Sequence, residues 1–109
     1  MSSKVKNTAK NMEQPEQKTK VMHYRIDVEV PGDGTRTTYM QVTGVPEDLP
    51  EEYEGTVMRA AEAQFAAALN QRLFLEFYSE GKTSKEEQPK FYNLSRLDWI
   101  QIKEITKLD

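Results

Sequence analysis

The run Arg72-Leu73-Phe74-Leu75-Glu76-Phe77-Tyr78 constrains the fold most, because large apolar residues occupy most positions of a very short segment. Short apolar runs with aromatic residues at both odd and even positions are typical of strands that are partly buried on both faces. In such a strand Phe77 and the two leucines point to one side, whereas Phe74 and Tyr78 point to the other. We expect the first side to pack against the alanine-rich segment that precedes the run. The aromatic residues of the second side then need a separate explanation.

Two strands joined by a tight turn are predicted upstream. Residues 21–30 alternate strictly between apolar and polar side chains, as in a half-buried strand. Pro31-Gly32-Asp33-Gly34 follows, and its proline and glycines favour a hairpin turn. The returning strand is predicted at about residues 36–43, with Met40 facing inward and Tyr39 facing outward. Gly44 and the residues after it are expected to end the sheet run.

A long helix is predicted to open at Asp48-Leu49-Pro50-Glu51 and to run to about Leu69. Asp48 and Glu51 match a capping box, and Pro50 is tolerated in the first turn. Asn70 is expected to end the helix in a left-handed conformation. One arc of about 120° is apolar, which is the width of a core-facing stripe. This stripe consists of Val57, Met58, Ala61, Phe65, Ala68 and Leu69.

The remainder of the chain predicts further strands. Residues 80–89 are polar and rich in helix and strand breakers, so a flexible loop is expected there. Residues 91–94 resume an extended pattern, and a last strand is predicted at about residues 97–105. Its apolar residues fall on both parities, which indicates burial on both sides or a bulge near Trp99. The fold class predicted is therefore α+β, a single small domain of order β-β-α-β-(β)-β with one long helix on one face of an antiparallel sheet.

Length and charge divide the 109 residues into two parts. Residues 1–20 lack an apolar period and are expected to form a flexible basic N-terminal arm, with residues 21–109 as the α+β domain. The arm has a net charge of +3 and the domain −6, which together make the −3 of the whole chain. The basic residues of the arm are Lys4, Lys6, Lys10, Lys18 and Lys20.

Targeting and membrane signals are weak throughout the chain. No stretch approaches the roughly 18 apolar residues that span a bilayer, and the N-terminus lacks the apolar core of a signal peptide. Cysteine is absent, which fits a reducing compartment. We therefore expect a soluble, cytoplasmic protein that does not contact a membrane.

The sequence offers little for catalysis. His23 falls on the polar face of a strand without a metal-ligand partner at suitable spacing. Asp27 and Glu29 lie on the same face, but Arg25 beside them favours a solvated ladder of charges. The glycines that follow Pro31 do not match a phosphate-binding loop. We expect no enzymatic activity, no cofactor, no metal site and no small-molecule substrate.

An acidic cluster marks the predicted start of the helix, and two interpretations of it remain open. Acidic residues at a helix N-terminus complement the positive end of the helix dipole. Alternatively, the cluster forms a patch that mimics nucleic-acid phosphates or binds a basic protein. The cluster consists of Glu47, Asp48, Glu51, Glu52 and Glu54.

Aromatic side chains are the strongest functional indication. Tyr39, Phe74, Tyr78 and Trp99 are candidates to share the sheet face opposite the helix. If neither the arm nor residues 80–93 cover that face, it forms a patch of the kind that usually marks an interface.

Three functions follow, in order of preference. The first is a non-enzymatic protein-interaction or assembly module, including self-association, and the size of the chain is compatible with a small viral or mobile-element accessory protein. The second is a single-stranded nucleic-acid-binding protein, which the acidic domain disfavours. The third is an acidic inhibitor that occupies a basic nucleic-acid-binding site on a partner.

Overall fold

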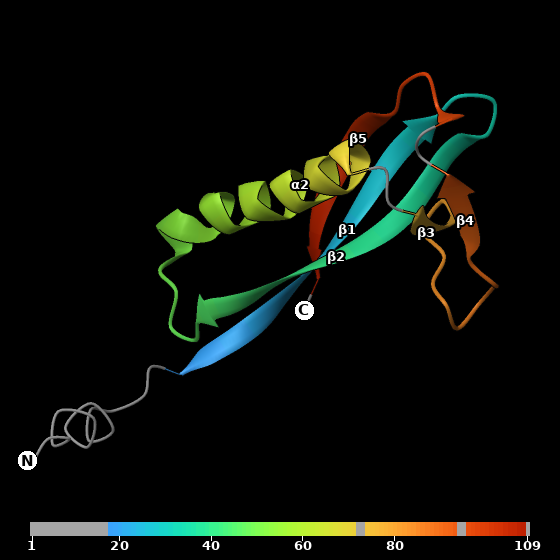
Figure 1. Cartoon of the computed structure of the whole chain (residues 1–109). Helices are drawn as coiled ribbons and strands as arrows, with labels where there is room; N and C mark the ends of the chain where they lie inside the picture. Colours follow the sequence, from blue (N-terminus) through green and yellow to red (C-terminus); the bar gives the residue numbers. More distant parts are fainter. Residues whose placement is uncertain (1–17, 72–73, 94–95, 109) are drawn as a thin grey trace, which may run out of the picture.

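The structure is a computed structural model, and it describes residues 18–71, 74–93 and 96–108. All strand pairings are antiparallel, and the strand order in the five-stranded sheet is β4-β3-β2-β1-β5. Figure 1 shows one long helix beside this sheet, which confirms the predicted α+β fold. The elements are β1 Thr19–Val30, β2 Gly34–Pro46, η1 Glu51–Tyr53, α2 Glu54–Asn70, β3 Phe74–Ser79, β4 Lys90–Asn93 and β5 Gln101–Leu108.

β1 and β2 form the predicted hairpin. Pro31 and Gly32 are the central residues of the turn, and the N–H of Asp33 donates to the carbonyl of Val30 at 3.0 Å. Gly32 has a φ of 84°. Proline at the second position and a positive φ at the third are the features of a type II turn.

Both strands of this hairpin extend beyond their predicted limits. β1 begins at Thr19, so Thr19 and Lys20 belong to the sheet rather than to the arm. The prediction that the sheet run ends at Gly44 is wrong. Gly44 has a φ of 73°, and the pairing register shifts there, opposite the segment between Lys20 and Met22. A glycine with positive φ in such a position produces a bulge rather than a strand end, and Val45 beyond it is buried.

Helix α2 covers one face of the sheet (Figure 1). The predicted stripe of the helix makes the contacts with the sheet. Phe65 is fully buried in one core cluster with Ile26 of β1 and Phe77 of β3. Ala61 belongs to a second cluster with Tyr24 of β1. Fully burying a side chain such as Phe65 contributes about 1.5–3 kcal/mol to stability. These two clusters fix the sheet and the helix as one body.

The start of the helix differs from the prediction. The chain enters through η1, and α2 begins only at Glu54. No side chain caps either element, so the predicted capping box of Asp48 and Glu51 is wrong. In η1 the N–H of Tyr53 donates to the carbonyl of Pro50 at 2.9 Å. Such a 3-10 bond satisfies by backbone a group that a capping side chain would otherwise have to satisfy.

The end of the helix also differs. Asn70 is the last helical residue, and Gln71 follows it with a right-handed φ of −85°. The N–H of Gln71 donates to the carbonyl of Ala67 at 2.9 Å, so the predicted left-handed cap at Asn70 is wrong. Within the described residues, no helix has the length and apolar character needed to cross a membrane.

The last strand, β5, starts four residues later than predicted. Its bulge lies at Lys103 rather than near Trp99, because the pairing with β1 skips one residue there. The extra residue reverses the alternation of side chains along the strand. Ile102 and Ile105 therefore both contact the core although they are three residues apart. This explains the mixed parity seen in the sequence.

Candidate functional site

Three of the four candidate aromatic residues lie together on the sheet. Tyr39 is on β2, and Phe74 and Tyr78 are on β3. The ring centroids of Tyr39 and Tyr78 are 6.0 Å apart, with an angle of 57° between the ring planes. Their sequence neighbours Met40 and Phe77 contact the core. Because side chains alternate along a strand, the three aromatic rings point to the face away from α2.

These side chains border a groove of about 590 Å³ between β2 and β3. Phe74 leaves 64% of its surface exposed at the groove, which is unusual for a large apolar side chain. We call this feature the aromatic groove. Its lining residues come from β2, β3 and the loop after β3, and they are Thr38, Tyr39, Met40, Phe74, Leu75, Glu76, Tyr78, Thr83 and Ser84.

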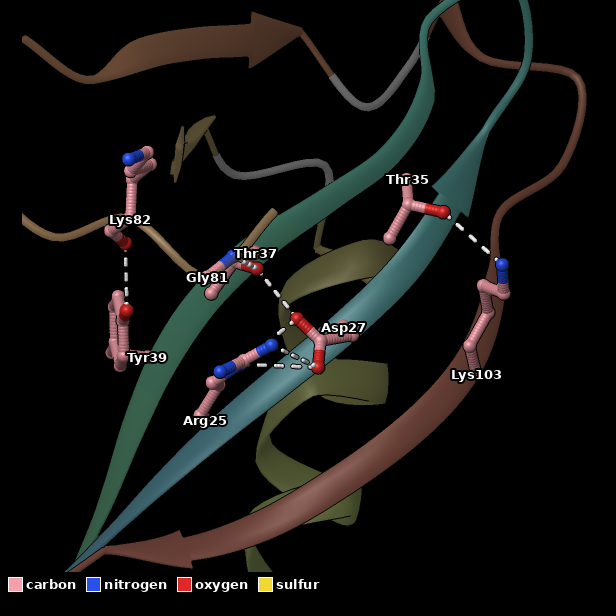
Figure 2. Close-up of polar contacts among 8 residues, drawn as sticks. All are labelled: Arg25, Asp27, Thr35, Thr37, Tyr39, Gly81, Lys82 and Lys103. Carbon is pink, nitrogen blue, oxygen red and sulfur yellow. Dashed lines mark hydrogen bonds and ion pairs between the residues drawn. The ribbon is translucent and has the colours of Figure 1, made fainter. Parts of the chain in front are cut away.

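The loop between β3 and β4 forms one wall of the aromatic groove. The hydroxyl of Tyr39 donates to the carbonyl of Lys82 at 2.7 Å (Figure 2). The N–H of Gly81 donates to the hydroxyl of Thr37 at 2.8 Å. The loop therefore covers part of the sheet face opposite α2, which was one of the two arrangements considered from the sequence.

Hydrogen bonds also hold this loop internally, in contrast to the flexible loop predicted for residues 80–89. The N–H of Ser79 donates to Glu87 at 2.7 Å, and the N–H of Thr83 donates to Glu86 at 2.9 Å. Sequence reasoning missed Thr83 and Ser84 as groove residues. The available signal was Thr83 followed by Glu86 at the third position, which matches a capping box.

A buried carboxylate lies beneath the loop. Asp27 is 4% exposed, and the Nε and Nη2 atoms of Arg25 contact it at 3.1 Å each. The hydroxyl of Thr37 donates to Asp27 at 2.5 Å and accepts from Gly81, so one chain of contacts joins sheet and loop (Figure 2). The hydrogen bond with Asp27 raises the pKa of Arg25. The predicted solvated charge ladder is wrong at Asp27, because the loop excludes water from it.

Charge is sparse in the aromatic groove. Glu76 is the one charged residue among the described residues that line it, and it lies between Phe74 and Tyr78 on the outer face of β3. Burial raises the pKa of Tyr39, so its hydroxyl stays neutral at physiological pH. The described part of the groove combines apolar rings, neutral hydroxyls and the carboxylate of Glu76.

Trp99 does not join the other aromatic residues. It precedes β5, which pairs with β1 on the side of the sheet away from β3. Trp99 is 52% exposed and does not line the aromatic groove. In the same part of the sheet Lys103 donates to Thr35 at 3.1 Å (Figure 2) and lies 3.6 Å from Glu29. These contacts tie β5 to the β1–β2 hairpin.

The predicted acidic cluster gathers at the start of the helix. Glu47, Asp48, Glu51 and Glu52 are exposed, and Glu54 lies 3.2 Å from Lys107 of β5. None of these acidic side chains caps the helix. Both interpretations of the cluster, dipole complementation and partner binding, stay predictions.

The basic arm is only partly described. Lys18 and Lys20 are exposed at the start of β1, and the carbonyl of Lys18 accepts from the N–H of Glu47 at 3.0 Å. Lys4, Lys6 and Lys10 lie outside the described residues.

Chemical groups for metal binding do not gather in the described part of the chain. No three histidine, aspartate or glutamate side chains there are grouped to hold a metal ion, and His23 is exposed on β1. No protein-family model, no curated protein and no solved structure matches this chain. The aromatic groove is therefore the feature of the chain from which a function can be inferred.

Proposed function

We propose that this chain is a non-enzymatic protein-interaction module that binds its partner at the aromatic groove. The observation that carries the proposal is the exposure of Phe74 beside the paired rings of Tyr39 and Tyr78. Burying apolar surface of this kind contributes about 25 cal/mol per Å² removed from water. Aromatic residues in partly enclosed pockets are also the residues that most often dominate binding energy at protein interfaces.

Two features of the lining support an interaction role rather than catalysis. General acid–base chemistry needs a proton donor or acceptor matched to its task, and usually a second group that orients it. Among the described residues, the lining supplies one carboxylate, Glu76, with tyrosine, threonine and serine hydroxyls and no histidine. The aromatic rings, Met40 and Leu75 supply apolar surface beside these groups, as in the central part of protein interfaces.

Single-stranded nucleic acid is the alternative ligand, since aromatic rings can stack on bases. Such sites combine aromatic rings with basic residues that follow the phosphate backbone. Among the described residues, the lining of the aromatic groove contains Glu76 and no lysine or arginine, and residues 21–109 carry a net negative charge. We therefore favour a protein partner, which can be another protein or a second copy of the chain. A cytoplasmic location and a role as a small viral or mobile-element accessory protein stay predictions from composition.

Selection of random ten-residue peptides displayed on phage, against the full chain, tests the proposed function. We expect enriched peptides whose affinity, measured by fluorescence anisotropy, falls at least 10-fold in Phe74→Ser. The matched control is Tyr53→Ser, because Tyr53 is also an exposed aromatic residue, 51% accessible, but lies in η1 away from the groove. Circular dichroism of both variants checks that they remain folded.

The same chain is titrated with a single-stranded 20-nucleotide oligothymidylate at low and high salt. Weak or absent binding supports the proposal. Tight binding that is lost at high salt and lost in Phe74→Ser would favour the nucleic-acid alternative, because phosphate contacts are released by added salt. Peptides that bind equally to both variants and to the parent chain would rule out the aromatic groove as the binding site.

A further inference from the structure

The aromatic groove lies between two strand edges rather than on one sheet face. Thr38, Tyr39 and Met40 line it from β2, and Phe74, Leu75 and Glu76 line it from β3. Consecutive residues of a strand point to opposite faces of the sheet. A hollow lined by three consecutive residues on each side is therefore bordered by the backbone of both strands as well as by their side chains.

The pairing of the strands shows the same opening. Within the described residues, β2 pairs with β3 at two positions, Arg36 with Ser79 and Thr37 with Tyr78. Beyond Thr37, β2 remains paired with β1 as far as Pro46. The segment 74–77 of β3 remains paired with β4. In the described part of the chain, each of these segments thus keeps one edge paired with a neighbouring strand and has no strand partner along its other edge. We call the two facing edges without a strand partner, at residues 38–41 and 74–77, the open seam.

One hydrogen bond shows which backbone groups point into the open seam. The hydroxyl of Thr38 donates to the carbonyl of Glu76 at 2.8 Å, in the place of a backbone partner on β2. In an antiparallel strand the N–H and C=O of one residue point to the same side, and this side alternates along the chain. Glu76 and Phe74 therefore direct their N–H groups into the seam. By the same alternation from the Thr37–Tyr78 pair, so do Tyr39 and Gln41 on β2.

We propose that the partner of this chain binds as an extended peptide segment that adds a strand to the free edge of β2 in the open seam. This inference rests on the proposed function and names the form in which the partner binds. Strand addition uses the main chain for affinity and alternate side chains for specificity. Here Tyr39 and Gln41 supply the backbone groups, and the rings of Tyr39, Phe74 and Tyr78 receive an apolar side chain of the peptide.

The carboxylate of Glu76 in the open seam should favour peptides that carry a basic residue. Within the described residues Glu76 forms no ion pair, and it lies on the same outer face as Phe74 and Tyr78. A lysine or arginine near the apolar residue of the peptide would pair with this carboxylate. The inferred ligand is therefore an extended segment with an apolar anchor and a neighbouring basic residue.

An N-methyl scan of the best peptide selected on the full chain tests the inference. Methylation of a backbone nitrogen removes one N–H donor and leaves the side chain intact. We expect binding to weaken about 10-fold or more at alternate peptide residues, whose N–H groups face β2. It should change less than about 3-fold at the residues between, whose N–H groups face β3, because the hydroxyl of Thr38 already bonds the carbonyl of Glu76 on that side.

Three outcomes decide between the two proposals. Alternating sensitivity supports strand addition. A peptide that requires Phe74 but tolerates methylation at every position would overturn strand addition and leave the proposed function intact. A selection that yields no peptide sensitive to Phe74→Ser would overturn both.

Discussion

At the scale of single residues, Thr37 is the side chain through which the sheet holds one wall of the aromatic groove. Its hydroxyl donates to the buried Asp27 and accepts from the N–H of Gly81. Thr37 itself is fully buried. Removing the hydroxyl leaves a carboxylate oxygen and a backbone N–H without this partner, and unsatisfied buried groups are costly.

Thr37→Val is expected to destabilise the fold by about 1–3 kcal/mol, because the variant keeps the shape of the side chain but loses both hydrogen bonds. Urea denaturation measures the loss, and hydrogen exchange should show a faster amide at Gly81. Thr43→Val on an exposed position of the same strand serves as the control. Equal stability losses at both sites, with an unchanged Gly81 amide, would contradict the role given to Thr37.

Asp33 links the β1–β2 turn to β4. It accepts a hydrogen bond from the hydroxyl of Tyr92 and lies 3.6 Å from the Nζ atom of Lys90. The bond from Tyr92, followed by the nearby positive charge of Lys90, lowers the pKa of Asp33. The folded state thus favours the ionised carboxylate more than the unfolded state does. This contribution to stability is complete above the ordinary aspartate pKa of about 3.9 and is lost as the pH falls through the lower folded value.

Tyr92→Phe should therefore lower the midpoint of urea denaturation most above about pH 5, where Asp33 is ionised in both the folded and the unfolded state. Below about pH 4 the difference from the parent chain should shrink, because the contribution of Asp33 is being lost in the parent as well. Tyr53→Phe, which changes an exposed hydroxyl in η1, should show no pH-dependent difference. A constant difference between parent and Tyr92→Phe from pH 3 to pH 7 would refute this assignment.

At the scale of elements, two glycines show how local backbone conformation determines the effect of a substitution. Gly44 has a φ of 73° at the bulge of β2, whereas Gly55 lies in α2 with no atom within 4 Å of an added Cβ. Left-handed backbone is unfavourable for a residue with a side chain, and alanine favours a helix over glycine.

Substitution of glycine by alanine should thus change the free energy of unfolding in opposite directions at the two sites. Gly44→Ala is expected to destabilise by about 1–2 kcal/mol, and Gly55→Ala to stabilise by about 0.5–1 kcal/mol. Thermal or urea unfolding measures both, and each variant is the control for the other. Changes of the same sign would show that the bulge or the helix start is described wrongly.

Elements whose pattern repeats were predictable from the sequence. The strict alternation of residues 21–30 predicts β1, and the helical stripe around Phe65 predicts the packing of α2, because each period fixes which side chains share a face. Alternation likewise brought Phe74 and Tyr78 to the outer face. The bulge at Gly44 was missed, and the bulge considered near Trp99 lies at Lys103, since register depends on the partner strand rather than on local sequence.

The parts of the candidate site that failed prediction depend on tertiary contacts. Asp27 is buried because a loop more than fifty residues later in the chain covers it. Trp99 was grouped with Tyr39 from its sequence pattern, but β5 pairs with β1 and so places it away from the groove. Neither pairing nor loop coverage leaves a periodic signal in the local sequence.

At the scale of the whole molecule, the sheet has two parts. β1, β2 and β5 form a continuous antiparallel sheet under α2, and β3 and β4 lie beside it (Figure 1). Within the described residues, β3 and β4 pair with each other and meet β2 at two residue pairs. The core through Phe65 and Phe77, and the contacts of Thr37 with the loop, hold the two parts together. The open seam is thus a consequence of how the two parts are joined, and unpaired strand edges are the features that recruit additional strands.

Amide hydrogen exchange, followed residue by residue by NMR, tests the open seam most directly. In the free chain the amides of Tyr39, Gln41, Phe74 and Glu76 should exchange rapidly, because they face the seam, whereas those of Met40, Leu75 and Phe77 should be protected by β1 and β4. Addition of the selected peptide should slow exchange at Tyr39 and Gln41. Slow exchange at all seven amides in the free chain would mean that β2 and β3 are paired along their full length, and the account of the aromatic groove as a strand-addition site would be contradicted.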